Sequence, residues 1–96
     1  MKEFIIKDEE GKEYTFVIKM PLPYETIKKA MNVIYRDGVD MIGGGDVILM
    51  ECLDHQLSTK DEAGNPVVLT DPYLRIGADM SCSGLIKFYS AELKKS

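Results

Sequence analysis

The feature that most constrains this chain of 96 residues is a dense apolar run near its middle. The run, GGGDVILMECLDHQL, occupies residues 43–57 and opens with three consecutive glycines. Apolar side chains cover more than one face of a helix built from this run, and such a helix is normally enclosed by neighbouring elements. We therefore predict a helix at the centre of the core, with Asp46 as the residue that caps its N-terminus.

A β-hairpin is predicted at the N-terminus. Residues 3–7 (EFIIK) and 13–20 (EYTFVIKM) are rich in aromatic and β-branched residues, and Gly11 between them can adopt a positive φ angle. One face of the second strand would carry Tyr14, Phe16 and Ile18. Because a two-stranded hairpin is only marginally stable alone, we expect the helices that follow to cover this face.

The segment after the hairpin predicts an amphipathic helix. Pro21 and Pro23 end the strand, since neither can donate a ladder hydrogen bond, and Pro23 suits a first helical position. Apolar residues then recur at spacings of three and four as far as Gly38, which we predict to be the C-terminal cap. Residues 39–42 would connect this helix to the central one.

Another long helix is predicted at the C-terminus. Asp71 would cap it, Pro72 would be its first residue, and it would continue to about Lys94. Its buried face would consist of Leu74, Ala78, Leu85 and Phe88. A line of small residues on one side indicates close approach of another helix, and it consists of Gly77, Ser81 and Gly84. A continuous helix is favoured, and a break near Gly84 is the alternative.

A polar segment at residues 58–66 contains the residue types typical of turns and is the best candidate for a mobile or binding loop. Its KDEAG echoes the KDEEG of the first turn, which raises the option of a second hairpin. We predict a short strand for the VVL run at residues 67–69. In all, residues 1–96 are predicted to form a single α+β domain, in which the hairpin packs against a three-helix bundle with a central buried helix.

Charge and composition argue against several functional classes. The sequence is 45% hydrophobic and 29% charged, as is usual for a globular domain. Its net charge of −4, without a basic cluster, argues against nucleic acid as a partner. No apolar run reaches the roughly 20 residues of a membrane helix, and the charged N-terminus does not resemble a signal peptide. We expect a cytoplasmic protein that does not bind membranes.

The sequence has no catalytic signature, and we predict no enzyme activity, no cofactor and no metal site. The GGGD segment lacks the lysine and hydroxyl residue of a phosphate loop, and its aspartate would repel phosphate. Cys52 and His55 could meet on one helix face, but a zinc site needs more ligands, and Cys82 is the only other soft one. Both cysteines are predicted to be buried thiols, with a disulfide between packed helices as the alternative.

The residues next to the predicted connections are the candidates for contact with a protein partner. Methionine forms adaptable contacts, and glycine lets a partner's backbone approach closely. The candidate residues are Met20, Met41, Ile42, Gly43, Gly44 and Gly45.

Three stretches carry a family resemblance: FIIKDEEGKEYTFVI at residues 4–18, GDVILMEC at residues 45–52 and AELKK at residues 91–95. Their order resembles that of small proteins of tailed bacteriophages and prophages, which are tail-assembly-chaperone-like or related morphogenesis proteins. The resemblance implies a non-enzymatic protein of the bacterial host cell that binds a protein partner, such as a phage tail component. It would bury an apolar segment of that partner in a groove or on an exposed hairpin edge.

Two other functions are alternatives to a chaperone. A structural subunit of the virion would associate with copies of itself through the same surfaces, as a homo-oligomer. A small enzyme or ligand-binding protein is disfavoured, because no polar residues converge in the sequence.

Overall fold

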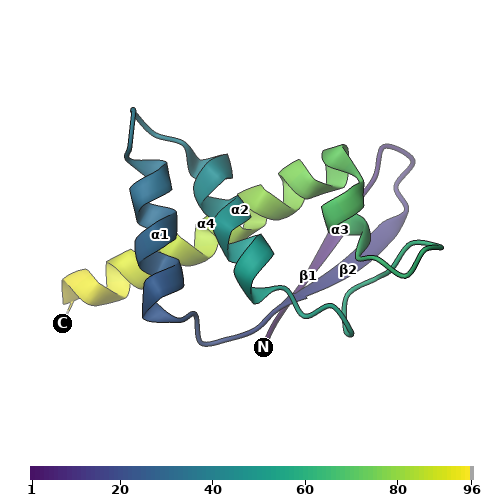
Figure 1. Cartoon of the computed structure of the whole chain (residues 1–96), viewed down its shortest axis with the longest axis horizontal. Helices are drawn as coiled ribbons and strands as arrows, with labels where there is room; N and C mark the ends of the chain where they lie inside the picture. Colours follow the sequence, from purple (N-terminus) through teal and green to yellow (C-terminus); the bar gives the residue numbers. More distant parts are fainter. Residues whose placement is uncertain (96) are drawn as a thin grey trace.

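The computed structural model describes the backbone of residues 1–95 and the side chains of residues 1–86. In this part of the chain, a two-stranded antiparallel hairpin is followed by four helices. In chain order the elements are β1 (Lys2–Lys7), β2 (Glu13–Ile18), α1 (Tyr24–Ile34), α2 (Met41–Cys52), α3 (Val67–Thr70) and α4 (Pro72–Lys95). The prediction of an α+β fold with an N-terminal hairpin is confirmed (Figure 1).

The central helix of the bundle is α2. It packs extensively against both α1 and α4, whereas those two helices contact each other only slightly. Figure 1 shows α1 and α2 side by side and running in opposite directions, with the long helix α4 crossing behind them. Ile48 and Leu49 of α2 are fully buried, as expected for a helix that its neighbours enclose.

The glycines of α2 lie inside the helix and face its neighbours. A Cβ atom at Gly44 would collide with the side chain of Ile34 on α1. A Cβ atom at Gly45 would collide with the backbone carbonyl of Asp79 on α4. Glycine costs about 1 kcal/mol of helix propensity relative to alanine, and the close approach of two helices from different sides offsets that cost.

The N-cap of α2 is Asp40. Its side chain accepts a hydrogen bond of 2.8 Å from the backbone N–H of Gly43. Asp46 lies in the second turn, so the prediction that it caps the helix is wrong. The reason is that Met41 and Ile42, predicted to belong to a connection, are already helical.

Replacing Asp40 by alanine is expected to lower the free energy of unfolding by about 1 kcal/mol, the usual effect of a lost N-cap. Asp37 lies exposed in the same connection, so Asp37→Ala is the matched control. The control should change stability by less than about 0.5 kcal/mol. Urea denaturation of both variants measures the difference. Equal effects of the two substitutions would show that the Asp40 cap does not stabilise α2.

The two edges of the hairpin differ. The backbone of β2 pairs with β1 on one side, and on its other side it is met by the segment that follows α2. The backbone hydrogen bonds, each 2.8 Å long, run from Lys19 to Cys52, from Asp54 to Val17 and from Thr59 to Thr15. Among the described strands only β2 pairs with β1, so the far edge of β1 is open.

One face of the hairpin belongs to the core, as predicted. Phe16 and Ile18 are fully buried, and the ring of Phe4 on β1 stacks on Phe16 with 4.9 Å between centroids. The side chain of Ile6 lies against Gly77 of α4. Helix α2 does approach α4 closely, at the backbone of Asp79, but not through the predicted glycines. Gly77 instead accommodates the hairpin, and a Cβ at Gly84 would have no described atom within 4 Å.

The two acidic turns that echo each other in the sequence have the same structure. In each, the carboxylate of the first residue, Asp8 or Asp61, accepts hydrogen bonds from backbone N–H groups two and four residues later. The fourth residue, Gly11 or Gly64, has a φ angle of 83° or 87°. The hydrogen bond from the fifth residue is the main reason why the pKa of each carboxyl group is lowered. The echo therefore marks a shared type of turn.

Two elements differ from their predictions because of where backbone hydrogen bonds go. Helix α1 ends at Ile34, before the predicted cap at Gly38, since the Ile34 carbonyl accepts a bond of 2.8 Å from Asp40 N–H. Residues 67–69, predicted to be a strand, form the single turn α3. The N–H of Asp71 donates to the carbonyl of Val67 at 2.9 Å and closes this turn.

The last helix, α4, is continuous from Pro72 to Lys95, so the alternative of a break near Gly84 is excluded. Asp71 caps it as predicted, because its carboxylate accepts a hydrogen bond of 2.9 Å from the N–H of Tyr73. In the predicted buried face, Leu74 and Ala78 are buried and Leu85 is half-buried, whereas Phe88 and the terminal lysines lie outside the described side chains.

Candidate functional site

A groove of about 400 Å³ lies between α1 and α2. Its apolar lining comes from Val33 on α1 and from Val47 and Met50 on α2. Met50 is 53% exposed and the two valines are half-buried, so this apolar surface is open to solvent. The polar residues that line the groove are Lys29, Asn32, Arg36, Asp46 and Glu51.

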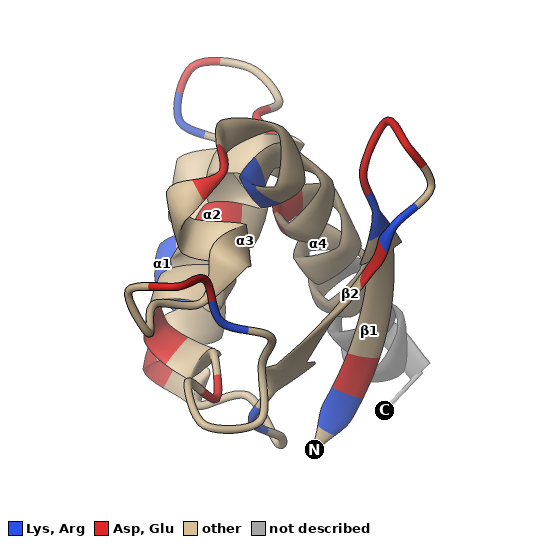
Figure 2. Ribbon diagram, turned by 90° about the vertical axis from the view of Figure 1, so that its right-hand side faces the viewer, with Lys and Arg blue, Asp and Glu red and all other residues tan. Residues whose placement is uncertain are grey.

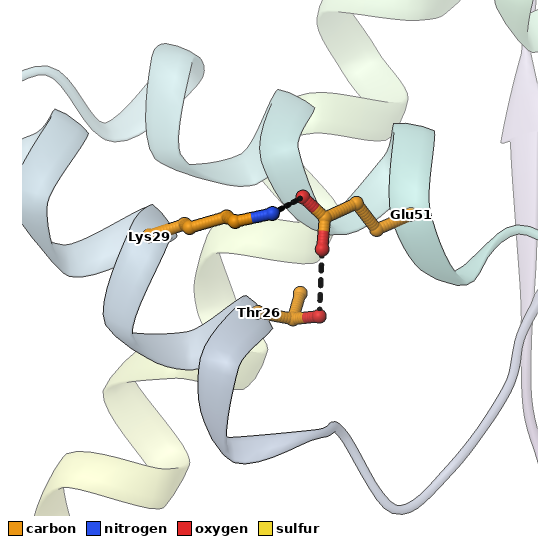
Figure 3. A network of polar contacts seen from close by, with 3 residues as sticks. All are labelled: Thr26, Lys29 and Glu51. Atoms are coloured by element: carbon orange, nitrogen blue, oxygen red, sulfur yellow. Dashed lines mark hydrogen bonds and ion pairs between the residues drawn. The ribbon is translucent and has the colours of Figure 1, made fainter.

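A polar network crosses the groove at one end (Figure 3). Glu51 on α2 accepts a hydrogen bond of 2.9 Å from Thr26 Oγ1 and forms an ion pair of 3.2 Å with Lys29 Nζ. The hydrogen bond from Thr26, and next that from Lys29, lowers the pKa of Glu51. Because Thr26 and Lys29 both lie on α1, the network holds the two helices together at this end of the groove.

The second carboxylate of the groove, Asp46, is bound by Arg75 of α4. Nε and Nη2 of Arg75 each donate a hydrogen bond of 2.9 Å, one to each carboxylate oxygen. This bidentate bonding holds the pKa of Asp46 below its ordinary value. Arg36, two residues beyond the end of α1, is then the cation of the groove that has no ion pair among the described residues.

The carboxyl group of Asp79 is buried on α4 beside Asp46. The residue is 4% exposed, and its Oδ1 has no hydrogen-bond partner among the described atoms. Burial, followed by the hydrogen bond and the repulsion between the two carboxyl groups, raises the pKa of Asp79 to about 7. The raised pKa favours the protonated form of Asp79, which can donate a hydrogen bond to the Asp46 carboxylate that Arg75 keeps ionised.

The six residues predicted to contact a partner lie in different environments. Met41 and Ile42 are exposed at the start of α2, at the end of the groove where Arg36 lies. Met20 is half-buried and packs against the core. The other three are Gly43, Gly44 and Gly45. These glycines face atoms of the same chain, and the second and third are buried, so the prediction that they contact a partner is wrong for those two.

The cysteines and the histidine do not form a joint site. Helix α2 ends at Cys52, so His55 lies beyond the helix and is exposed, whereas Cys52 is buried. Cys52 and Cys82 are both free thiols, as predicted. Burial raises the pKa of both thiols, that of Cys82 to about 12. Within the described side chains, no three His, Cys, Asp or Glu residues are placed to hold a metal ion.

Reasoning from the sequence missed both the open side of α2 and the buried Asp79. Apolar residues lie on more than one face of α2, which indicated burial on all sides. Met50 nevertheless remains exposed, because α1 and α4 leave one side of the helix uncovered. Asp79 follows Arg75 by four positions, a spacing typical of a surface ion pair on a helix. The spacing therefore favoured the wrong interpretation. In the structure Asp79 is buried, and Arg75 binds Asp46 of α2 instead.

A second exposed apolar surface lies beside the open edge of β1, and we name it the β1–α4 surface. A hollow of about 350 Å³ is lined by Ile6 and Lys7 of β1 and by residues of α4, and no residue of β2 lines it. The hollow is thus on the outer side of β1. The exposed apolar residues of the β1–α4 surface are Tyr73, Ile76 and Met80, each at least half exposed, whereas Ile5 is exposed on the opposite face of β1.

No helix in the described part of the chain combines the length and the hydropathy needed to cross a lipid bilayer. Comparisons with protein-family models, with curated proteins and with solved structures found no match. The α1–α2 groove and the β1–α4 surface are two places where described apolar side chains lie open to solvent beside a hollow.

Proposed function

We propose that this chain is a protein-binding factor of phage or prophage origin that acts as a chaperone in tail assembly. The observation that supports a binding function is the α1–α2 groove, where apolar side chains stay open to solvent between two packed helices. The phage origin, the host cytoplasm as its location and a tail component as its partner rest on the sequence resemblance alone. The proposed activity is non-enzymatic and needs no cofactor.

The shape and charge of the groove suit an amphipathic helix of the partner protein. An apolar side chain of that helix would enter between Val33, Val47 and Met50 and exclude water from them. The two carboxylates of the groove are already bound by Arg75 and by Lys29, so Arg36 supplies the unpaired charge. A partner with an acidic side chain beside its apolar residues would therefore match the groove.

Met50→Glu is expected to reduce capture of the partner about tenfold or more, because a charge would replace the central apolar contact. Leu57→Glu is the matched control: Leu57 is 59% exposed, much like Met50, but it does not line the groove. The measurement is affinity capture from cells that produce tailed phage, with mass spectrometry of the bound proteins. Selective loss of a tail protein from the Met50 variant supports the proposal. Equal capture by both variants contradicts it.

A structural virion subunit is the second candidate function, and the β1–α4 surface favours it because that surface is free to associate with other copies. The two candidates differ in where the protein is found after assembly. A chaperone binds the tail component in the cell and is absent from purified particles, whereas a structural subunit is present in them.

A further inference from the structure

The open edge of β1 presents the backbone groups of every second residue. Thr15 and Val17 of β2 use their backbone groups to bind the segment that follows α2, so these groups face away from β1. Their partners in the ladder are Ile5 and Glu3. In an antiparallel pair such residues direct N–H and C=O away from the shared side. Ile5, Glu3 and, two residues further along, Lys7 therefore present donors and acceptors on the open edge.

The side chains of the same strand are self-complementary. The sequence from residue 2 to residue 8 is KEFIIKD, and it has Ile5 at its centre. Residues at equal distances on the two sides of Ile5 either carry opposite charges or are both apolar. These pairs are Lys2 with Asp8, Glu3 with Lys7 and Phe4 with Ile6. An antiparallel partner with this sequence would match the edge at every position.

We propose that the chain forms a symmetric homodimer in which the β1 strands of two copies pair antiparallel about Ile5. The two hairpins then merge into one four-stranded sheet, and both open edges are removed. Each Ile5 faces the Ile5 of the other copy, and each Glu3 faces a Lys7. This inference goes beyond the proposed chaperone function, because the residues that line the hollow beside β1 do not line the α1–α2 groove. It gives the second candidate function, a self-associating subunit, a specific interface.

The charge pattern selects this register over its neighbours. Hydrogen bonding requires that the edge residues of the two copies lie opposite each other, so the symmetry axis has to pass through a residue. An axis through Phe4 would place Glu3 opposite Ile5. An axis through Ile6 would place Lys7 opposite Ile5. Both shifts set a charge against an apolar side chain, and only the axis through Ile5 pairs Glu3 with Lys7.

The same register covers the apolar residues of α4. Ile6 faces α4, where it lies against Gly77, and Phe4 shares its side of the sheet. In the dimer, Phe4 and Ile6 of the second copy extend this layer over the hollow beside β1. The residues they cover are Tyr73, Ile76 and Met80, which are 58%, 50% and 60% exposed in the single chain.

Charge at the ends of the strand agrees with this arrangement. Figure 2 shows the acidic turn at the end of β1 that lies away from the N-terminus. Asp8, Glu9 and Glu10 of this turn line a hollow together with Asp71 at the start of α4. Antiparallel pairing brings the N-terminal end of the second copy, with its Lys2, to these acidic residues.

The dimer is tested by exchanging the charges of Glu3 and Lys7, both of which are exposed. Glu3→Lys or Lys7→Glu alone sets like charges opposite each other at two symmetric positions. Each variant is therefore expected to raise the dimer dissociation constant about tenfold. The double variant restores opposite charges and should return the constant close to that of the wild type. Sedimentation velocity of the full chain over a concentration series measures the constants, and circular dichroism confirms folding.

A cross-link gives a second readout. In the proposed register the two Ile5 Cα atoms are about 5.5 Å apart, within the range that a disulfide spans. Ile5→Cys should therefore form a covalent dimer on oxidation, whereas Leu57→Cys, at an equally exposed position, should not. A wild-type protein that stays monomeric, or a double charge variant without rescue, overturns the dimer. Neither result affects partner capture through the groove, which Met50→Glu tests separately.

Discussion

The Asp79→Asn variant is expected to be more stable than the wild type at about pH 8 and to lack most of its pH dependence between about pH 5 and pH 8. In the wild type, burial and the proximity of Asp46 raise the pKa of Asp79 from 3.8 to about 7 in the folded state. Asparagine is uncharged at all these pH values. It can still donate a hydrogen bond to Asp46, so it imitates the protonated Asp79.

The sign of the effect follows from which state binds the proton more tightly. The folded protein holds the Asp79 proton, so the stabilisation is complete below pH 3.8 and is lost as the pH rises through about 7. Each pKa unit corresponds to about 1.4 kcal/mol, so the loss is of the order of 4 kcal/mol at most. The pKa of Asp46 is lowered instead, and its contribution is lost only as the pH falls below 3.8.

Urea denaturation at a series of pH values measures this difference. Glu51→Gln is the control, because Glu51 lies on α2 like Asp46 but has a lowered pKa, so its ionisation makes stability depend on pH only in acid. The control should therefore keep the wild-type slope between about pH 5 and pH 8. Equal slopes for the wild type and Asp79→Asn would contradict the raised pKa of Asp79 in the folded state.

Gly45→Ala is expected to destabilise the protein by about 3 kcal/mol or more, although alanine favours helices more than glycine does. The new Cβ would collide with the carbonyl of Asp79 and would lie 3.1 Å from the backbone N of Ser83. Both are backbone atoms of α4, so no side chain can rotate away. The two helices would have to separate, and the buried contact between them would be lost.

Gly84→Ala is the matched control within the same fold. Gly84 is exposed on α4, and a Cβ there would have no described atom within 4 Å. The control should raise stability by about 0.5–1 kcal/mol through helix propensity alone. Thermal and urea denaturation of the two variants measure the changes in stability, which should have opposite signs. A stabilising effect at both positions would show that α2 and α4 do not approach as closely as described.

Elements with strong local signals could be predicted from the sequence. The DEEGK turn between two β-branched runs predicted the hairpin, and Asp71-Pro72 predicted the start of α4. The start of α2 could not be predicted in this way, because both Asp40 and Asp46 precede apolar residues. The choice depends on Ile34, whose carbonyl binds Asp40 N–H and so ends α1 early enough for Asp40 to become the cap.

The candidate site was harder to predict than the start of α2, because it depends on more contacts between residues that are distant in the sequence. Three glycines in a row indicate a flexible start of a helix. Two of them are accommodated inside α2 because Ile34 occupies the space of the missing side chain at Gly44 and Asp79 that at Gly45. Met50 is exposed because α1 and α4 leave one side of α2 uncovered. The local sequence does not indicate which side of a helix its neighbours will leave open. For the same reason the sequence predicted a contact surface near Met41 but not the groove beside it.

The bonding of β2 to the segment that follows α2 has a consequence for the order of folding. The hydrogen bond from Thr15 N–H to Thr59 Oγ1 joins residues 44 positions apart, and that from Val17 N–H to Ser58 Oγ joins residues 41 positions apart. A two-stranded hairpin alone is marginally stable, and contacts this distant form only after the intervening chain is complete. The hairpin precedes these partner residues in the chain, and we expect it to be among the last parts of the fold to become stable.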